Sequence, residues 1–340
     1  MREKITDIEE NIRTSKHRDN FFKLLQKDIT IYISPYRKEF VYINCPNCNG
    51  KKNKKSFEKG RFSYFLCPEC GTLFVNPRPP KNILDLFYMS SKAVKASVKS
   101  LVDMERGRMK YIFQPRSRLI LDFLREMGKK KGDLLEVGCS VGTMLKIIKE
   151  KSKFNVYGVD PSMWAFEKSR EKGLKVYQKT LEEYEPGNKK YDVVLNFETI
   201  EHVFSPIEFL NKINQITKKG GYLVFTTPNY HGFDMLTLGR YYKNIHAPCH
   251  LNYFNVNSID LILKRAGYGV VKKMTPGILD ISIVRKQIDE NIAPKMPAVI
   301  NHLVFHTSKE TQYDFQKFLR NNLLSGNMLI FAKKVRGQKE

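Results

Sequence analysis

One short segment constrains the fold of this chain more than any other. It combines a buried strand and a glycine-bearing turn over residues 134–142 with a helix and a second strand that ends in Asp160. Glycine lets the backbone pass close to a ligand, and a carboxylate at the end of the second strand can accept hydrogen bonds from both hydroxyls of a ribose. Asp160 follows Gly142 by 18 positions, near the roughly 20-residue offset of nucleotide-binding βαβ units. The segment therefore predicts the nucleotide-binding half of a doubly wound α/β domain.

The composition of the turn distinguishes between cofactors. A dinucleotide site requires Gly-x-Gly-x-x-Gly, so that a pyrophosphate can sit on the helix N-terminus. Here the spacing is Gly138-x-x-x-Gly142, with Glu136 just before it. A carboxylate beside the turn repels a pyrophosphate but suits an aminoacyl group that carries an ammonium. The two glycines also fit a turn that only packs a helix, and Asp160-Pro161-Ser162 also fits a helix start with proline at its first position.

These residues resemble motif I of the class I S-adenosylmethionine (SAM) methyltransferases, in which an acidic residue is followed by Gly-x-Gly-x-Gly. Ser140 takes the place of the middle glycine, a departure that tightens the turn without removing the site. The resemblance implies an enzyme that uses SAM as its cofactor. The residues that it assigns to SAM binding are Glu136, Gly138, Cys139, Ser140, Gly142, Asp160, Pro161 and Asn196.

Later segments extend this resemblance. The apolar run 191–197 is typical of a central parallel strand. An amphipathic helix follows from Pro206, is expected to end with the cations and glycines at 218–221, and is followed by a strand at 222–229. This order is similar to motifs IV to VI of class I methyltransferases. It looks most like the ubiquinone-biosynthesis O-methyltransferase branch, which carries Glu-His, Gly-Gly and Thr-Pro-Asn at these places.

The likeness covers roughly residues 134–270. It implies a doubly wound, seven-stranded Rossmann-like α/β sheet, with the sixth strand at 268–271 and the seventh at 327–334. Around this sheet we expect six segments. They are an N-terminal extension at 1–40, a zinc ribbon at 41–76, a proline connector and helical segment at 77–130, the SAM-binding core at 131–274, a helical insertion and candidate lid at 275–326, and the last strand and tail at 327–340.

Glu201 and His202, just past the fourth strand, are the candidate catalytic pair. Methyl transfer is an in-line displacement that mainly requires alignment, and an imidazole beside a carboxylate can serve as its base. Alternatively, Glu198, Glu201 and His202 lie at i, i+3 and i+4, and a helical turn would converge them with His246 or His250 around a divalent cation such as Mg²⁺. Similar Glu-x-x-Glu-His patterns occur in metal-dependent ubiquinone O-methyltransferases and in small-RNA 2′-O-methyltransferases. A third interpretation is that Glu201 and His202 only orient the substrate or cap the helix.

Two Cys-x-x-Cys pairs form the second strong signal. They are Cys45 with Cys48 and Cys67 with Cys70, and 18 residues separate Cys48 from Cys67. That spacing lies within the range of four-cysteine zinc sites, in which the metal can fold a short segment that lacks its own core. No signal peptide is visible before these pairs, which disfavours disulfides, and a redox role is the weaker alternative. We expect a closed, structural Zn²⁺ site.

The formal net charge of +24 suits polyanionic partners, and lysines at 51–55 would give the ribbon a basic, RNA-binding tip. A lysine-rich solvated surface is the simpler explanation.

Our leading hypothesis is a cytoplasmic SAM methyltransferase that acts on O or C of a small anionic or glycan-type acceptor, such as a nucleotide-linked sugar. The ribbon, Asn76-Pro77-Arg78-Pro79 and Glu201-His202 resemble enzymes of that kind. The alternatives are an RNA methyltransferase and a non-catalytic SAM-fold binding protein. No apolar run approaches the roughly 20 residues of a membrane span.

Overall fold

The computed structural model describes residues 5–290, 292 and 296–337. Within these residues, seven strands form one sheet in the order β10-β11-β8-β7-β4-β5-β6. They are β4 (Lys131–Val137), β5 (Lys153–Val159), β6 (Lys175–Tyr177), β7 (Tyr191–Phe197), β8 (Thr217–Pro228), β10 (Tyr268–Met274) and β11 (Asn327–Lys334). The strands from β6 to β8 are parallel, and β11 lies antiparallel between β8 and β10. This arrangement confirms the predicted seven-stranded Rossmann-like sheet.

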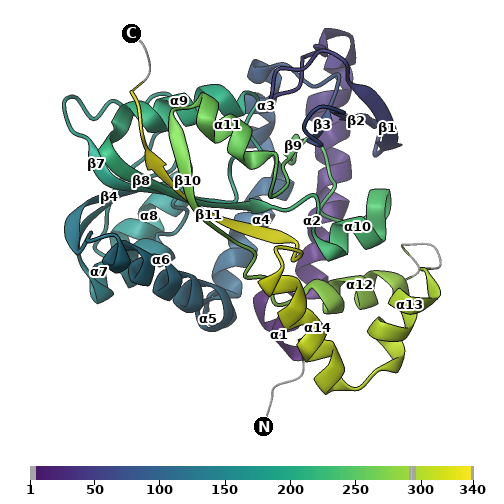
Figure 1. Ribbon diagram of the computed structural model, residues 1–340. Helices are drawn as coiled ribbons and strands as arrows, with labels where there is room; N and C mark the ends of the chain where they lie inside the picture. The colour runs from purple at the N-terminus through teal and green to yellow at the C-terminus, as the bar shows by residue number, and fades with distance from the viewer. Residues whose placement is uncertain (1–4, 291, 293–295, 338–340) are drawn as a thin grey trace.

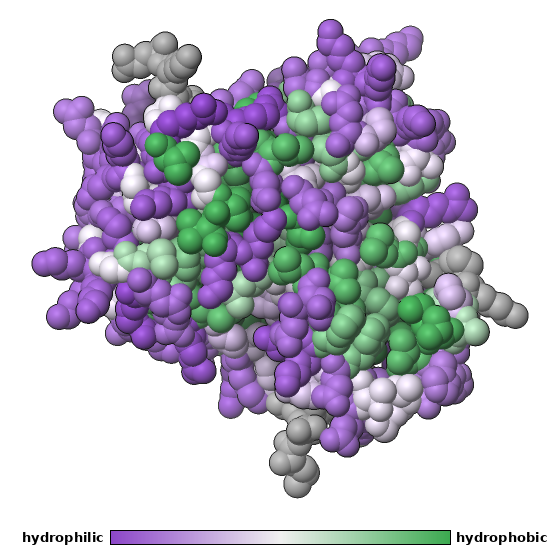
Figure 2. All heavy atoms as spheres, viewed as in Figure 1, coloured by the Kyte–Doolittle hydropathy of each residue, from purple (hydrophilic) through white to green (hydrophobic). Residues whose placement is uncertain are grey.

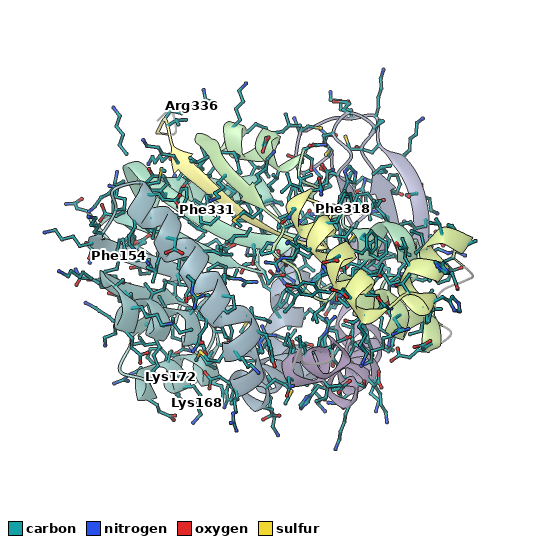
Figure 3. All side chains as sticks on the ribbon, turned by 60° about the horizontal axis from the view of Figure 1, so that its bottom comes forward. Phe154, Lys168, Lys172, Phe318, Phe331 and Arg336 are labelled. Atoms are coloured by element: carbon teal, nitrogen blue, oxygen red, sulfur yellow. The ribbon has the colours of Figure 1, made fainter. Side chains whose placement is uncertain are left out.

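Helices cover both faces of the sheet (Figure 1). Those that fill the two layers are α6 (Gln114–Glu126) and α7 (Thr143–Lys151) on one face, and α9 (Pro206–Ile216) and α11 (Ile259–Arg265) on the other. Successive strand residues point to opposite faces, so Leu134 packs under the first pair of helices and Leu135 under the second. In Figure 3, Phe331 marks the first layer, where its ring centroid lies 4.3 Å from that of Phe123.

The end of α9 differs from the sequence prediction. Residues 218–221 do not end the helix, because α9 stops at Ile216 and β8 already begins at Thr217. Thr217 pairs with Tyr191, and the next pair joins Tyr222 to Val193, so the lysines and glycines form an irregularity inside the strand. Strand pairing with β7 therefore overrides the local helix-stop signal.

A second, smaller sheet joins the cysteine-rich segment to the rest of the chain. Its strands are β1 (Lys54–Lys59), β2 (Phe62–Leu66), β3 (Leu73–Val75) and β9 (Asn252–Tyr253), in that order. Strand β9 comes from the segment that follows β8, so the hairpin predicted as a zinc ribbon is hydrogen-bonded to the segment that carries His250. The contact between β3 and β9 is therefore a structural link between the two parts of the chain.

The remaining helices gather at one side of the main sheet. They are α1 (Ile5–Ile12), α2 (Ser15–Asp28), α3 (Lys81–Ser90), α4 (Lys92–Asp103), α5 (Glu105–Arg108), α8 (Met163–Glu171), α10 (Phe233–Leu238), α12 (Asp280–Asp289), α13 (Ala298–Asn301) and α14 (Lys309–Asn321), with α8 standing apart beside β6. One hydrophobic core joins α2, the small sheet and the insertion through residues such as Leu25, Tyr64 and Val284. Ion pairs add to it, with Lys286 2.6 Å from Glu10 and Arg18 2.8 Å from Glu290.

The surface is mostly hydrophilic in the view of Figure 2, and apolar residues gather over the helical insertion. Val299 and Phe318, which are 64% and 52% exposed, belong to this region. None of the helices in the described part of the chain combines the length and the apolar character that a membrane span requires.

Candidate functional site

The glycine-bearing turn lies between β4 and α7, at the carboxyl end of the sheet. Gly138, Ser140 and Gly142 all have left-handed backbone conformations, with φ of 72°, 47° and 71°. A side chain on Gly142 would also collide with Leu174, because its Cβ would lie 2.4 Å from Leu174 Cδ1. Glycine is therefore required here by backbone conformation and by helix packing, so the packing role considered from the sequence is present in the structure.

Asp160 connects the turn to the end of β5. One carboxylate oxygen accepts a hydrogen bond from the Ser140 backbone N–H at 2.8 Å, and the other accepts from the Ser162 N–H at 3.0 Å. Burial raises the pKa of Asp160, while these two backbone donors act in the opposite direction. Ser162 itself caps α8 through its side chain. The capping role thus belongs to Ser162, and each Asp160 oxygen keeps a lone pair for a further donor.

Three polar atoms around this turn are buried and find no hydrogen-bond partner among the described residues: Glu136 Oε2, Ser140 Oγ and Asn196 Oδ1. The amide nitrogen of Asn196 donates to the Val137 carbonyl at 3.0 Å, which orients its free oxygen. Burial raises the pKa of Glu136 well above its usual range, the charge of Asp160 raises it further, and the charge of Arg116 opposes both. Buried polar groups normally have partners, so this group of atoms indicates a polar ligand.

A second group lies past β7 and contains Glu201, His202 and His250, whose ligand atoms lie within 4.8 Å of one another. His202 Nδ1 is 2.7 Å from the Cys249 carbonyl, and His250 Nδ1 is 2.9 Å from the Asn244 carbonyl. A carbonyl can only accept, so both Nδ1 atoms carry the proton and both Nε2 atoms keep a free lone pair. The two Nε2 lone pairs can therefore accept a proton or bind a metal ion.

Glu201 is fully buried; one of its carboxylate oxygens accepts from the Thr227 hydroxyl at 3.0 Å, and the other lies 3.9 Å from His202 Nε2. Glu198 lies outside the group of three. Its backbone is left-handed, with φ of 50°, and its carboxylate accepts from the Thr226 hydroxyl at 2.5 Å and from the Asn327 amide at 2.9 Å. The segment forms a turn rather than a helix, so Glu198 does not join the expected i, i+3, i+4 convergence. Glu201 and His202 do lie beside His250, one of the two histidines expected from the later segment.

The electrostatics of this group favour neutral imidazoles. Burial lowers the pKa of His202, although the charge of Glu198 opposes that effect. Burial lowers the pKa of His250 well below its usual range, and His246 and His202 lower it further. The His246 ring lies beside the group, with its centroid 4.2 Å from that of His250. At neutral pH these rings are therefore uncharged, the form that serves as a base or a metal ligand.

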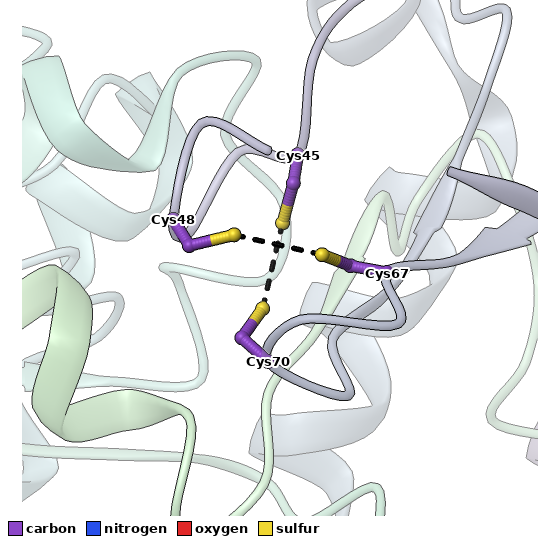
Figure 4. Close-up of side chains that lie close together, drawn as sticks. All are labelled: Cys45, Cys48, Cys67 and Cys70. Carbon is purple, nitrogen blue, oxygen red and sulfur yellow. Dashed lines mark hydrogen bonds between the residues drawn. The ribbon is translucent and has the colours of Figure 1, made fainter. Parts of the chain in front are cut away.

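The four cysteines of the two Cys-x-x-Cys pairs converge on a common centre (Figure 4). The Sγ atoms of Cys45 and Cys70 are 3.6 Å apart and those of Cys48 and Cys67 are 3.5 Å apart, and all four residues are free of disulfides. Tetrahedral zinc with Zn–S distances of about 2.3 Å would separate its sulfurs by about 3.8 Å. The Gly50 backbone N–H also lies 3.4 Å from Cys48 Sγ, as a donor to a thiolate would. This cluster fits a bound metal ion.

Comparisons with known proteins agree with the geometry. Residues 109–273 match the family model described as a methyltransferase domain. A probable SAM-dependent methyltransferase of Mycolicibacterium smegmatis is 27% identical over 140 residues, which cover 41% of this chain and 52% of that protein. A ubiquinone biosynthesis O-methyltransferase of Rickettsia canadensis is 33% identical over 105 residues, which cover 29% of this chain and 44% of that protein.

These comparisons support a SAM-dependent methyltransferase domain over residues 109–273. It spans about half the length of the curated relatives that it matches. Among solved structures, a SAM-dependent methyltransferase of Thermotoga maritima has a TM-score of 0.43 at 20% identity, and the match covers 70% of this chain and 97% of that chain.

Sequence reasoning missed Arg116, which α6 places near the glycine-bearing turn, where its charge acts on Glu136. Its guanidinium lies 5.1 Å from the Phe197 ring centroid, and its charge acts on both Glu136 and Glu198. Several arginines lie in this helix, so the local sequence does not distinguish Arg116 as a functional residue. Only the fold shows that this arginine faces the carboxylates at the strand ends.

Tyr88 and Arg78 lie in the segment predicted as a proline connector and helical segment, and they support the histidine group. The Tyr88 hydroxyl donates to the Cys249 carbonyl at 2.9 Å and lies 3.4 Å from His202 Nδ1. Arg78 is fully buried, and its guanidinium donates to the Val75 and Phe204 carbonyls, the Leu251 carbonyl and the Asn252 side chain at 2.9 to 3.4 Å. Arg78 therefore joins the segment after His202 to the segment after His250.

Proposed function

We propose that this protein transfers a methyl group from SAM to an oxygen or carbon of a small anionic or glycan-type acceptor, for example a nucleotide-linked sugar. The observation that carries the proposal is the adjacency of two features at the carboxyl ends of the strands, where a Cβ on Gly138 would lie only 3.0 Å from Thr199 Oγ1. One is the set of unpartnered polar atoms around Asp160, and the other is the pair of free Nε2 atoms on His202 and His250. The first suits a polar cofactor, and the second suits removal of a proton from the acceptor.

The residues of the first group have distinct roles in this proposal. Asp160 binds the ribose hydroxyls with its remaining lone pairs, and Glu136 pairs with the ammonium of the aminoacyl group. Gly138, Cys139, Ser140, Gly142 and Pro161 shape the backbone around the cofactor, and Asn196 supplies its free side-chain oxygen. Arg116 is placed to bind a carboxylate. When bound, SAM supplies a sulfonium methyl group that a nucleophile takes by in-line displacement.

His202 acts on the acceptor side. Its Nε2 accepts the proton of an acceptor hydroxyl while the oxygen–methyl bond forms and the carbon–sulfur bond breaks. The Cys249 carbonyl and Tyr88 hold the ring in the tautomer that this step needs. Alternatively, and in place of the base role of His202, Glu201, His202 and His250 would hold a divalent cation such as Mg²⁺, which would polarise the acceptor hydroxyl. Cys45, Cys48, Cys67 and Cys70 would hold a structural Zn²⁺.

An RNA acceptor is the second candidate. Lys51, Lys52, Lys54 and Lys55 are all exposed at the start of the β1–β2 hairpin, and such a cluster attracts phosphates. Lys55 is paired with Glu58 at 2.5 Å, which leaves part of this charge compensated within the hairpin.

Transfer of labelled methyl from SAM into fractionated cell extract tests the proposal. Label in the small-molecule or glycan fraction supports it, whereas ribonuclease-sensitive label favours the RNA acceptor. His202→Asn should abolish incorporation, and His306→Asn, a change at an exposed histidine whose ring contacts Asn301 in the helical insertion, should leave it intact. Incorporation that survives EDTA would support His202 as the base without a divalent cation, and full activity of His202→Asn would refute both roles.

A further inference from the structure

A cavity of about 350 Å³ lies between α2, the β1–β2 hairpin and residues 241–247. Its lining includes one carboxylate, that of Asp19, together with Phe22, Lys59, Tyr64, Tyr241, Lys243 and His246. Small-molecule sites usually measure roughly 300 to 1,000 Å³ and combine an apolar lining with a few polar groups. The cavity has both properties, and neither the SAM turn nor the cysteine cluster contributes to it.

Lys59 gives this cavity an uncompensated positive charge. It is the last residue of β1, and its ammonium donates to the Tyr242 carbonyl at 2.6 Å. Among residues 5–290, 292 and 296–337, no carboxylate forms an ion pair with it. Burial lowers the pKa of Lys59 to about 8, and the charge of Lys243 lowers it further. The ammonium is still largely protonated at pH 7, so a half-buried cation stands here with only a carbonyl as its partner.

Lys243 adds a second ammonium on the same cavity. Its Nζ lies 2.7 Å from Glu290 and 4.0 Å from Asp19, and Asp19 itself is largely exposed. These carboxylates compensate Lys243, but they do not pair with Lys59. The two ammonium groups that line one cavity repel each other, and an anionic ligand between them would offset this electrostatic repulsion. An ammonium acts as a point charge and is a common ligand of phosphate.

The cavity borders the histidine group. Phe22 and His246 line this cavity and also a neighbouring one of about 200 Å³, which His250 lines as well. The His246 ring lies against that of His250 with its plane tilted by 42°, and the centroid of His250 lies 4.7 Å from that of His202. A ligand anchored at Lys59 can therefore extend along His246 towards the free Nε2 atoms of His250 and His202.

We propose that Lys59 and Lys243 bind a phosphate group of the acceptor in this cavity, with the remainder of the acceptor directed past His246 to the methyl-transfer site. This inference rests on the proposed function and narrows its acceptor to a phosphorylated small molecule. The aromatic side chains Phe22, Tyr64 and Tyr241 provide the apolar wall against which a ring of that acceptor can pack. The β1–β2 hairpin thereby contributes a substrate-binding residue in addition to any structural role.

Calorimetric titration of the full chain with sodium pyrophosphate, without added divalent metal, tests this site. We expect saturable binding at one site and at least about a tenfold weaker affinity in Lys59→Gln, because a charged hydrogen-bond donor is lost. The matched control is Lys54→Gln, an exposed lysine on the same strand, which should bind within about twofold of the wild type. Circular dichroism of each variant confirms that the fold is retained.

Equal affinity in Lys59→Gln and the wild type, or the absence of saturable binding, would overturn the inference. SAM titration of the same preparations separates this result from the proposed function. A protein that binds SAM but not pyrophosphate refutes only the phosphate site, whereas one that binds pyrophosphate but not SAM refutes the methyl-transfer proposal. If a single-stranded RNA displaces pyrophosphate and its affinity depends equally on Lys54 and Lys59, the ligand is nucleic acid and the small-molecule site is wrong.

Discussion

Replacement of the fully buried Arg78 by methionine should destabilise the whole protein, although Arg78 is none of the residues proposed to bind SAM or metal. Its guanidinium donates four hydrogen bonds, and no carboxylate pairs with it among the described residues. Two of these bonds reach the 251–252 segment and one reaches Phe204. Methionine fills most of the same volume but donates none of them.

The expected loss in the free energy of unfolding follows from the hydrogen-bond acceptors that Arg78→Met leaves without a donor. Without Arg78, the Val75 and Phe204 carbonyls and the Asn252 side-chain oxygen each lose a donor in a buried environment. A buried acceptor that is left unsatisfied costs about 1 to 3 kcal/mol. Removal of a desolvated charge offsets part of this cost, so we expect a net loss of about 3 kcal/mol in the free energy of unfolding.

Urea denaturation followed by circular dichroism measures this loss. Arg125→Met is the matched control, because Arg125 is exposed and forms only a surface pair with Asp122 at 2.9 Å. Its free energy of unfolding should change by no more than about 0.5 kcal/mol. Arg78→Lys should recover less than half of the loss, because an ammonium lacks the planar fork of donors. A value for Arg78→Met within about 1 kcal/mol of the wild type would refute the reasoning.

Three further predictions concern other parts of the molecule. Asp160→Ala should weaken SAM binding at least about tenfold, because it removes the proposed ribose contacts and frees the Ser140 N–H; unchanged affinity in calorimetry would contradict the cofactor site. The wild type should carry about one zinc ion per chain by elemental analysis, and Cys67→Ser should lose it; a metal-free wild type would argue against the site. Burial and the charge of Asp280 raise the pKa of Asp234 from 3.8 to about 7, so the folded state binds this proton more tightly than the unfolded state. That stabilisation is complete below pH 3.8 and is lost as the pH rises towards 7. The free energy of unfolding, measured by urea denaturation from pH 4 to 8, should therefore decline by about 2 to 4 kcal/mol, and Asp234→Asn should flatten this decline.

Local patterns in the sequence were sufficient to predict the fold and the position of the glycine-bearing turn. The run 191–197 reads as a central strand because both of its faces are covered by helices, and the glycines at 138 and 142 are required by left-handed backbone conformations. The spacing of the four cysteines likewise predicted their convergence. The strand and the turn are indicated by residues that lie close together in the chain. The cysteine cluster is indicated by a repeated Cys-x-x-Cys spacing that is typical of zinc sites.

Tertiary structure alone decided which distant side chains meet. Strand pairing between β3 and β9, together with backbone hydrogen bonds from Leu251 and Asn252 to the Glu201 carbonyl at 2.9 and 3.1 Å, brings His250 to His202 and leaves Glu198 outside the group. The positions of Arg78 and Lys59 follow from the same packing of the hairpin against the methyltransferase domain. A sequence pattern records the period of an element and the identity of its residues. It does not record which buried polar atoms of two distant segments will satisfy each other, because that depends on how the whole core excludes water.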